Sequence, residues 1–118
     1  MWEVEYSDQF EAWWSELSVD DQERVAAAIE LLEECGPSLG RPLVDTLEGS
    51  RHSNMKELRP PGGYMRVLFA FDSRRAAILL FGGDKRDRWS VWYADAIRVA
   101  DRLYDEHVKT LREEGLIP

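Results

Sequence analysis

The sequence predicts an α+β fold in which the elements follow the order β-α-α-β-β-β-α and the strands form a mainly antiparallel sheet. Three observations predict it: a short alternating run followed by helical spacing near the N-terminus, three strand-like runs in the middle, and a long helical pattern near the C-terminus. The 118 residues are 44% hydrophobic and include five tryptophans, which suffices for the core of a single domain over 1–118.

One strand and two helices are predicted at the N-terminal end. Apolar and acidic side chains alternate over 2–6, which is the period of a half-buried strand. Aromatic and aliphatic residues then recur every three or four positions over 8–17, so a helix is expected there, with Ser7 or Asp8 as its N-cap. A second helix is expected over 18–35, and because almost no linker separates the two helices, they are predicted to form an antiparallel hairpin.

The middle of the chain predicts a loop followed by closely spaced strands. Residues 37–53 contain prolines and glycines without a sustained period, so an ordered loop is expected there. Strand patterns follow at 54–59, 64–72 and 76–81. Gly82 and Gly83 interrupt the apolar pattern and are interpreted as a turn at the end of the last strand. A long C-terminal helix over 89–114 completes the fold.

Positive charge gathers in the strand region, although the chain as a whole has a net charge of −8. The stretch from Arg51 to Arg88 holds nine basic and four acidic residues, whereas the rest of the chain holds six basic and nineteen acidic ones. The nine basic residues are Arg51, Lys56, Arg59, Arg66, Arg74, Arg75, Lys85, Arg86 and Arg88. This asymmetry favours an anionic partner for the strand region. It also fits a protein whose helices are acidic and whose strands are basic without a functional reason.

The pattern of reactive residues excludes several kinds of site. Cys35, His52 and His107 do not have the spacing of metal ligands, and no serine or cysteine lies in a nucleophile elbow. The glycine pairs lack the spacing of phosphate-binding loops, so neither a metal nor a cofactor is expected. The single cysteine, the lack of a long apolar run and the lack of a signal-peptide pattern predict a cytoplasmic protein without a membrane role.

Four residues, Arg59, Arg66, Lys85 and Tyr93, are candidates for the catalysis of RNA cleavage by the substrate's own 2′-hydroxyl. Arginine binds phosphate through two parallel hydrogen bonds, and lysine or tyrosine can transfer protons once neighbouring cations lower its pKa. Such a set needs no metal.

Strand alternation separates two of the basic residues in this region. It places Lys56 on one face with Leu58, and Arg59 on the other face. A second interpretation of Arg59 and Arg66 remains open, in which they form structural ion pairs with Glu57, Asp72 or Asp84. The spacing of these residues does not choose between catalysis and ion pairing.

Several motifs resemble the phage-derived, HigB-like branch of the RelE/ParE toxin superfamily. They lie at 40–45 (GRPLVD), 55–60 (MKELRP), 66–72 (RVLFAFD) and 82–85 (GGDK), and in the C-terminal helix from Trp92 to Tyr104. The motifs follow one another in the order typical of that family and cover nearly the whole chain. The resemblance implies a RelE-like fold and the toxin component of a type II toxin–antitoxin pair.

The resemblance also implies an activity, partners and roles for particular residues. Toxins of this kind bind a helix-turn-helix antitoxin, reach operator DNA only through it, and cut messenger RNA, usually on the ribosome. It implies phosphate contacts for Arg59 and Arg66, and proton transfer or substrate positioning for Lys85 and Tyr93. The basic residues expected to contact RNA are Lys56, Arg86 and Arg88. Two alternatives remain: a ParE-like protein that inhibits DNA gyrase without catalysis, and a non-toxic remnant that only binds an antitoxin.

Overall fold

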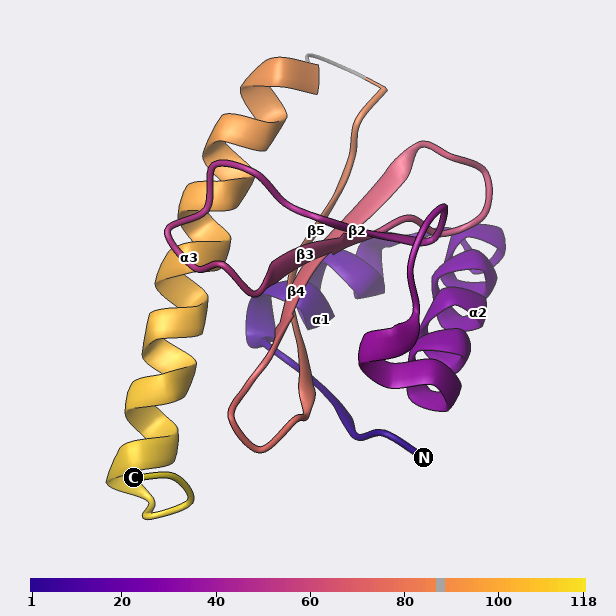
Figure 1. Ribbon diagram of the computed structural model, residues 1–118. Helices are drawn as coiled ribbons and strands as arrows, with labels where there is room; N and C mark the ends of the chain where they lie inside the picture. The colour runs from indigo at the N-terminus through magenta and orange to yellow at the C-terminus, as the bar shows by residue number, and fades with distance from the viewer. Residues whose placement is uncertain (87–88) are drawn as a thin grey trace.

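The computed structural model describes residues 1–86 and 89–118, with the side chains of 1–86 and 91–118 (Figure 1). In chain order the strands and helices are β1 (Val4–Tyr6), α1 (Asp8–Glu16), α2 (Val19–Cys35), the short 3-10 helix η1 (Gly36–Ser38), β2 (Val44–Thr46), β3 (Met55–Leu58), β4 (Met65–Phe71), β5 (Ala77–Asp84) and α3 (Trp89–Glu113). The α+β class and the long C-terminal helix predicted from the sequence are confirmed.

The strands form one five-stranded sheet in the order β1-β5-β4-β3-β2. β1 pairs with β5 in parallel, and the other neighbours are antiparallel, so the sheet is mainly antiparallel as predicted. β5 therefore runs between β1 and β4, which agrees with its continuously apolar sequence. The register between β4 and β5 shifts at Leu68/Phe69, and this bulge lets Leu80 and Phe81 both pack on the side of α3.

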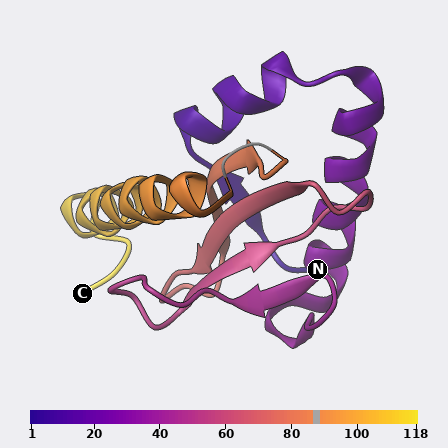
Figure 2. The ribbon, with the colours of Figure 1, turned by 90° about the horizontal axis from the view of Figure 1, so that it is seen from above.

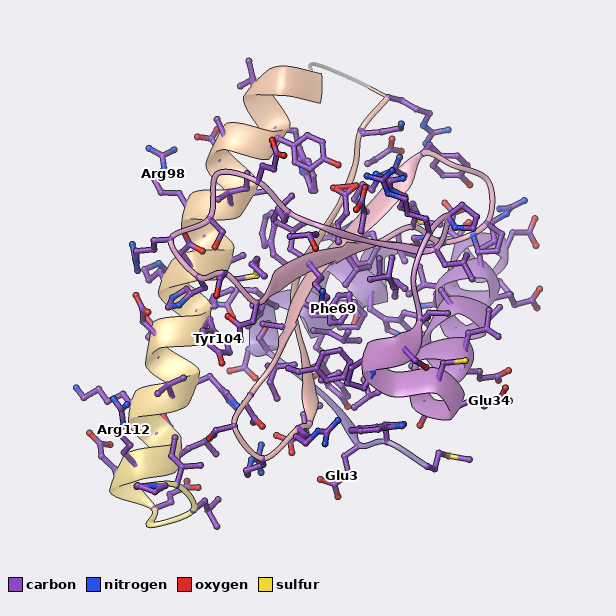
Figure 3. All side chains as sticks on the ribbon, in the orientation of Figure 1. Glu3, Glu34, Phe69, Arg98, Tyr104 and Arg112 are labelled. Carbon is purple, nitrogen blue, oxygen red and sulfur yellow. The ribbon has the colours of Figure 1, made fainter. Side chains whose placement is uncertain are left out.

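Helices cover both faces of the sheet and create two separate cores. On one face, α1 and α2 bury Phe10, Val25 and Leu32 against the sheet residue Phe69, which Figure 3 labels. On the other face α3 lies along the sheet (Figures 1 and 2) and packs Ala96, Ala100, Leu103 and Tyr104 against it. This division follows from alternation along β4, since successive side chains point to opposite faces.

α3 is amphipathic along its length. Its apolar side faces the second core, whereas Arg98 and Arg112 extend away from the sheet (Figure 3). Gly115 follows the helix with φ +73°, a left-handed conformation that glycine adopts without strain, so it ends the helix as predicted. Across the described residues, no helix combines the length and the apolar character that crossing a bilayer requires.

The predicted loop over 37–53 contains a strand that the sequence pattern did not indicate. Val44–Thr46 forms β2, the edge of the sheet, and pairs antiparallel with β3. Only Val44 of its three residues is buried. A strand this short shows no period, and it is stabilised by hydrogen bonding to β3 rather than by a pattern of its own.

The interpretation of Gly82 and Gly83 as a strand-end turn is wrong, because both lie within β5. Their lack of side chains serves packing. A Cβ on Gly82 would lie 2.2 Å from the ring of Trp13, and a Cβ on Gly83 would lie 2.2 Å from the ring of Trp92. The two glycines thus let α1 and α3 each place a tryptophan ring directly on the backbone of β5.

The two N-terminal helices begin where the sequence predicts but do not align as an antiparallel hairpin. The Ser7 hydroxyl accepts a hydrogen bond from the Phe10 amide, and the Ser18 hydroxyl accepts one from the Asp21 amide, so each serine caps its helix. Figure 2 shows α1 and α2 running in different directions. α1 packs mainly on β5, whereas α2 packs beside β1 and η1, so the sheet rather than the partner helix orients each of them.

Candidate functional site

A buried carboxylate on β3, that of Glu57, lies at the centre of the candidate site. Glu57 and Arg59 face α3, while Lys56 and Leu58 face the opposite core, as strand alternation predicts. Only 6% of the Glu57 side chain is exposed. A carboxylate this deeply buried requires positive partners or hydrogen-bond donors.

Arginines and a tyrosine from three elements surround this carboxylate. Arg59 Nε donates to Glu57 Oε1 at 3.0 Å, and Arg66 Nε of β4 lies 3.3 Å from the same oxygen. The Tyr93 hydroxyl of α3 donates to the two carboxylate oxygens at 2.8 and 2.6 Å. The structure therefore brings together Arg59, Arg66 and Tyr93, which are distant in sequence. We call these residues, together with Glu57 and Lys85, the Glu57 cluster.

The fold holds Arg66 in one orientation. Its side chain is 7% exposed, and Nη1 donates to the carbonyl oxygens of Gly63 and Met65 at 3.0 and 2.8 Å. Arg66 pairs across the sheet with Gly83, which is the residue covered by the Trp92 ring. An arginine fixed by backbone carbonyls keeps its position when its partner changes, a property that suits an anion-binding site.

Lys85 follows β5 directly and lies close enough to Arg66 and Arg59 for their positive charges to act on it. Its backbone amide donates to the Tyr64 carbonyl at 2.8 Å. Burial lowers the pKa of the Lys85 ammonium, and the positive charges of Arg66 and Arg59 lower it further, against an opposing effect of Glu57. This direction agrees with the expectation that neighbouring cations lower the pKa of a candidate proton-transfer group.

For Tyr93 the same expectation is wrong. Burial raises the pKa of its hydroxyl well above the usual range, and the hydrogen bond to Glu57 raises it further, while Arg66 lowers it by less. The phenol therefore stays protonated and acts as a hydrogen-bond donor. The sequence does not show that the Tyr93 hydroxyl bonds to the Glu57 carboxylate.

Of the three residues expected to contact RNA, the two that the structure describes, Lys56 and Arg86, do not join the Glu57 cluster. Lys56 lies on the opposite face of β3. Arg86 forms an ion pair with Asp84 and places its guanidinium over the Tyr64 ring, 4.1 Å from the centroid. Arg88 lies outside the described residues.

The four catalytic candidates predicted from the sequence all belong to the Glu57 cluster. The fifth member, Glu57, is predicted only as one of three possible ion-pair partners of the arginines. The signal that identifies Glu57 is its place on the strand, two residues before Arg59 and on the same face. The proximity of Arg66 to Glu57 can be inferred only once the pairing of β3 with β4 is known.

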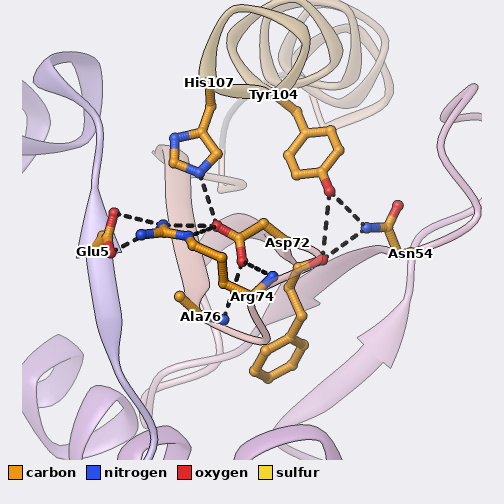
Figure 4. Close-up of polar contacts among 8 residues, drawn as sticks. Glu5, Asn54, Asp72, Arg74, Ala76, Tyr104 and His107 are labelled. Carbon is orange, nitrogen blue, oxygen red and sulfur yellow. Dashed lines mark hydrogen bonds and ion pairs between the residues drawn. The ribbon is translucent and has the colours of Figure 1, made fainter. Parts of the chain in front are cut away.

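A second carboxylate, that of Asp72, lies at the far end of α3 and also binds an arginine two residues later (Figure 4). Its oxygens accept hydrogen bonds from the amides of Arg74 and Ala76 at 2.9 and 3.2 Å, and His107 Nε2 lies 3.0 Å away. Arg74 also contacts Glu5 of β1 at 3.0 Å. We call these residues the Asp72 cluster. Among the residues that the structure describes, no group of three or more His, Cys, Asp or Glu side chains could hold a metal ion.

Solved structures with the same fold are RelE toxins. The isolated E. coli RelE toxin superposes with a TM-score of 0.60 at 12% identity, covering 84% of this chain and 99% of RelE. RelE in the RelB-RelE antitoxin-toxin complex from Methanococcus jannaschii gives 0.59 at 11% identity, covering 75% of this chain and 99% of that one. The fold thus defines the class, a RelE-like α+β protein.

Sequence comparison identifies the family within that class. Residues 12–105 match the family model described as "Phage derived protein Gp49-like". HigB2 of Mycobacterium tuberculosis is 51% identical over 86% of this chain, and HigB3 of the same organism is 52% identical over 80%. The aligned region spans 52% of HigB2 and 82% of HigB3, so the chain spans about half the length of HigB2. The chain belongs to the Gp49-like family, which is of the HigB and RelE type.

Proposed function

We propose that this chain is the toxin of a type II toxin–antitoxin pair and cleaves messenger RNA on the ribosome without a metal ion. The observation that carries the proposal is the convergence of Arg59, Arg66, Lys85 and Tyr93 around one carboxylate on the α3 side of the sheet. HigB2 and HigB3 are named as toxins, which supports the toxin assignment.

Arg66 and Arg59 bind the phosphate that is cleaved. In the free protein both arginines contact Glu57. An RNA phosphate offers a similar partner, two non-bridging oxygens that share a negative charge, and arginine binds it bidentately. The two guanidinium groups then stabilise the extra negative charge that develops on the phosphorane. Arginine keeps its charge at any working pH.

Glu57 and Lys85 suit the two proton transfers. The 2′-oxygen attacks phosphorus, its proton passes to a base, and the P–O5′ bond breaks as the 5′-oxygen takes a proton from an acid. Glu57 is the group of the cluster able to accept a proton, since the others are cations or a phenol of raised pKa. Lys85 has a lowered pKa, which makes its ammonium a better proton donor to the 5′-oxygen. Tyr93 orients the Glu57 carboxylate.

The distribution of charge fits a ribosomal substrate despite the acidic total. Residues 1–35 hold eleven acidic residues and one basic residue, Arg24. They form β1, α1 and α2, whose core lies across the sheet from α3 and the Glu57 cluster. The protein can therefore face RNA with its cationic side while the acidic side points away. The partner that neutralises the toxin is a helix-turn-helix antitoxin, through which the pair contacts operator DNA in the cytoplasm.

The decisive experiment incubates the purified chain with ribosomes that carry a defined messenger RNA and maps the new 5′ ends. Cleavage that persists in the presence of EDTA after ribosomes have been stabilised with polyamine supports the proposal. Intact messenger RNA together with gyrase-linked DNA breaks would identify a gyrase inhibitor instead. Intact messenger RNA with normal growth on expression would identify a binding protein without toxicity.

A further inference from the structure

A groove of about 510 Å³ lies on the side of the sheet away from the Glu57 cluster. Side chains of β1, α1, α2 and β5 form it: Val4, Tyr6, Phe10, Glu11, Trp14, Ser15, Ile29, Glu33 and Leu79. Its volume lies within the range of ordinary binding pockets. It lies between α1 and α2, which run in different directions (Figure 2), with residues of β1 and β5 at its base.

The floor of the groove is a row of aromatic rings. Tyr6 and Phe10 have ring centroids 6.0 Å apart, and Phe10 stacks with Trp14 at 6.4 Å. Tyr6 is 59% exposed although most of its surface is apolar, and Trp14 is half-buried. Aromatic rings that stay open to solvent in a concave surface are typical of an interaction site.

Negative charge surrounds this apolar floor. Glu11 and Glu33 line the groove, and the segment 1–35 that builds most of it has a net charge of −10. Its one basic residue, Arg24, is already in an ion pair with Asp21 at 2.9 Å. The surface therefore repels nucleic acids and acidic peptides and attracts a cationic partner.

We propose that this groove binds an amphipathic, basic helix of a partner protein. Apolar side chains at helical spacing would enter between α1 and α2 and pack on Tyr6 and Trp14, while lysines or arginines beside them would meet Glu11 and Glu33. The site is independent of RNA cleavage, because it lies on the opposite face of the sheet from Glu57 and shares no residue with that cluster. Binding and cleavage can thus succeed or fail separately.

The test uses three synthetic peptides and the full chain. The first carries leucines at positions i, i+3, i+4 and i+7 with lysines elsewhere, the second replaces the lysines with glutamates, and the third has the composition of the first in an order without an apolar face. Calorimetric titration should show one-to-one binding of the first peptide, with a gain of helical circular dichroism. The second should not bind, and the third should bind at least about tenfold more weakly.

Matched variants locate the binding. Glu11→Lys and Glu23→Lys make the same charge change in the acidic segment, but only Glu11 lines the groove, and both residues are exposed. Glu11→Lys should weaken binding about tenfold and Glu23→Lys less than about threefold. Tyr6→Ala should weaken it more than Val19→Ala, which removes a side chain that is 70% exposed and lies outside the groove. Equal losses within each pair, equal binding of the first and third peptides, or no binding of the first peptide would overturn the proposal.

Discussion

The Glu57 and Asp72 clusters are built from the same parts, yet their charges balance differently. Each centres on a carboxylate with an arginine two residues later, and each receives one side chain from α3, Tyr93 in one and His107 in the other. Both carboxylates are buried, with 6% of the Glu57 side chain and 1% of the Asp72 side chain exposed. They lie towards opposite ends of the same helix.

The partners around each carboxylate separate a structural site from the proposed anion-binding site. Asp72 accepts hydrogen bonds from two backbone amides, and its arginine is shared with a second acid, Glu5 (Figure 4). Although burial alone would raise the pKa of Asp72, hydrogen bonds from His107 and Arg74 hold it below its usual range. A shared arginine, a histidine and two backbone amides bind the Asp72 carboxylate, so the cluster ties β1, the β4–β5 turn and α3 together.

The Glu57 cluster instead holds more positive than negative charge. Arg59, Arg66 and Lys85 act on one central carboxylate, and Arg59 also contacts Asp45, whose oxygen lies 3.5 Å from its Nη2. A group of cations around one carboxylate attracts an anion from outside, which is the role proposed for the RNA phosphate. The count of charges, and not the presence of an arginine–carboxylate pair, is therefore the basis on which we propose anion binding at Glu57.

The largest effect is expected from removal of the fixed arginine. Arg66→Ala should lower the rate of messenger RNA cleavage about 10²–10³-fold, since removing one donor to a developing oxyanion costs that much. Arg74→Ala, which changes the corresponding residue of the Asp72 cluster, should leave the rate per folded molecule unchanged. The measurement is the initial rate of cleavage with ribosomes, normalised by circular dichroism to the folded fraction.

Arg66→Lys serves as a second variant that keeps a positive charge beside the buried Glu57 carboxylate. It should fold normally and recover less than a tenth of the wild-type rate, because lysine cannot bind phosphate bidentately. A tenfold loss of rate corresponds to about 1.4 kcal/mol of lost binding free energy. Wild-type cleavage by Arg66→Ala and Arg66→Lys would contradict a phosphate contact and favour the structural ion pair.

The next effect compares two tyrosines on α3. Tyr93→Phe should lower cleavage about 10²-fold, because the Glu57 carboxylate loses the hydroxyl that orients it for proton transfer. Tyr104→Phe removes a hydroxyl that accepts a hydrogen bond from Asn54 at 3.1 Å in the other half of the molecule (Figure 4), and it should leave the rate unchanged. Parallel measurement of both rates at one temperature tests the difference. Equal rates for the two variants would remove Tyr93 from the proposed mechanism.

A smaller effect concerns stability and its dependence on pH. Asp72→Asn should lower the free energy of unfolding by about 2 kcal/mol at pH 7, since charge-assisted hydrogen bonds are lost. The folded-state pKa of Asp72 is lowered, so the unfolded chain binds more protons between that pKa and 3.8. Wild-type stability should therefore rise with pH in this window and be lost as pH falls through the folded pKa. Urea titrations at several pH values give the free energy of unfolding as a function of pH. Its rise with pH should be shallower in Asp72→Asn than in the wild type, and an unchanged rise would contradict this role of Asp72.

These contrasts show what the sequence alone could predict. The helices and most strands follow from periodicity, because a period of 3.6 or 2 is repeated often enough to be recognised in each. β2 is too short to show a period, and the glycines of β5 resemble a turn unless the tryptophans that cover them are known. Those two features depend on contacts between distant segments, which no local pattern contains.

The site divides in the same way. Arg59, Arg66, Lys85 and Tyr93 are identified by residue type and motif, and the structure brings them to one place. The importance of Glu57 and the raised pKa of Tyr93 depend on which side chains meet across β3, β4 and α3. Charge balance around a buried group is a three-dimensional property, so the sequence alone left catalysis and ion pairing as equal interpretations.

The smallest expected effect tests the surplus charge itself, without RNA. The chain has three lysines, Lys56, Lys85 and Lys109, so the side-chain Cε signal of Lys85 can be followed by NMR against pH. Lys85 should lose its proton at lower pH than an ordinary lysine side chain. Because Arg59 is one of the cations that lower the pKa of Lys85, Arg59→Gln should move that titration to higher pH, whereas Arg74→Gln should not move it. If Lys85 titrates as an ordinary lysine side chain does, or if both variants shift its titration equally, the cationic field around Glu57 does not exist as described, and the two clusters would be alike in charge as well as in construction.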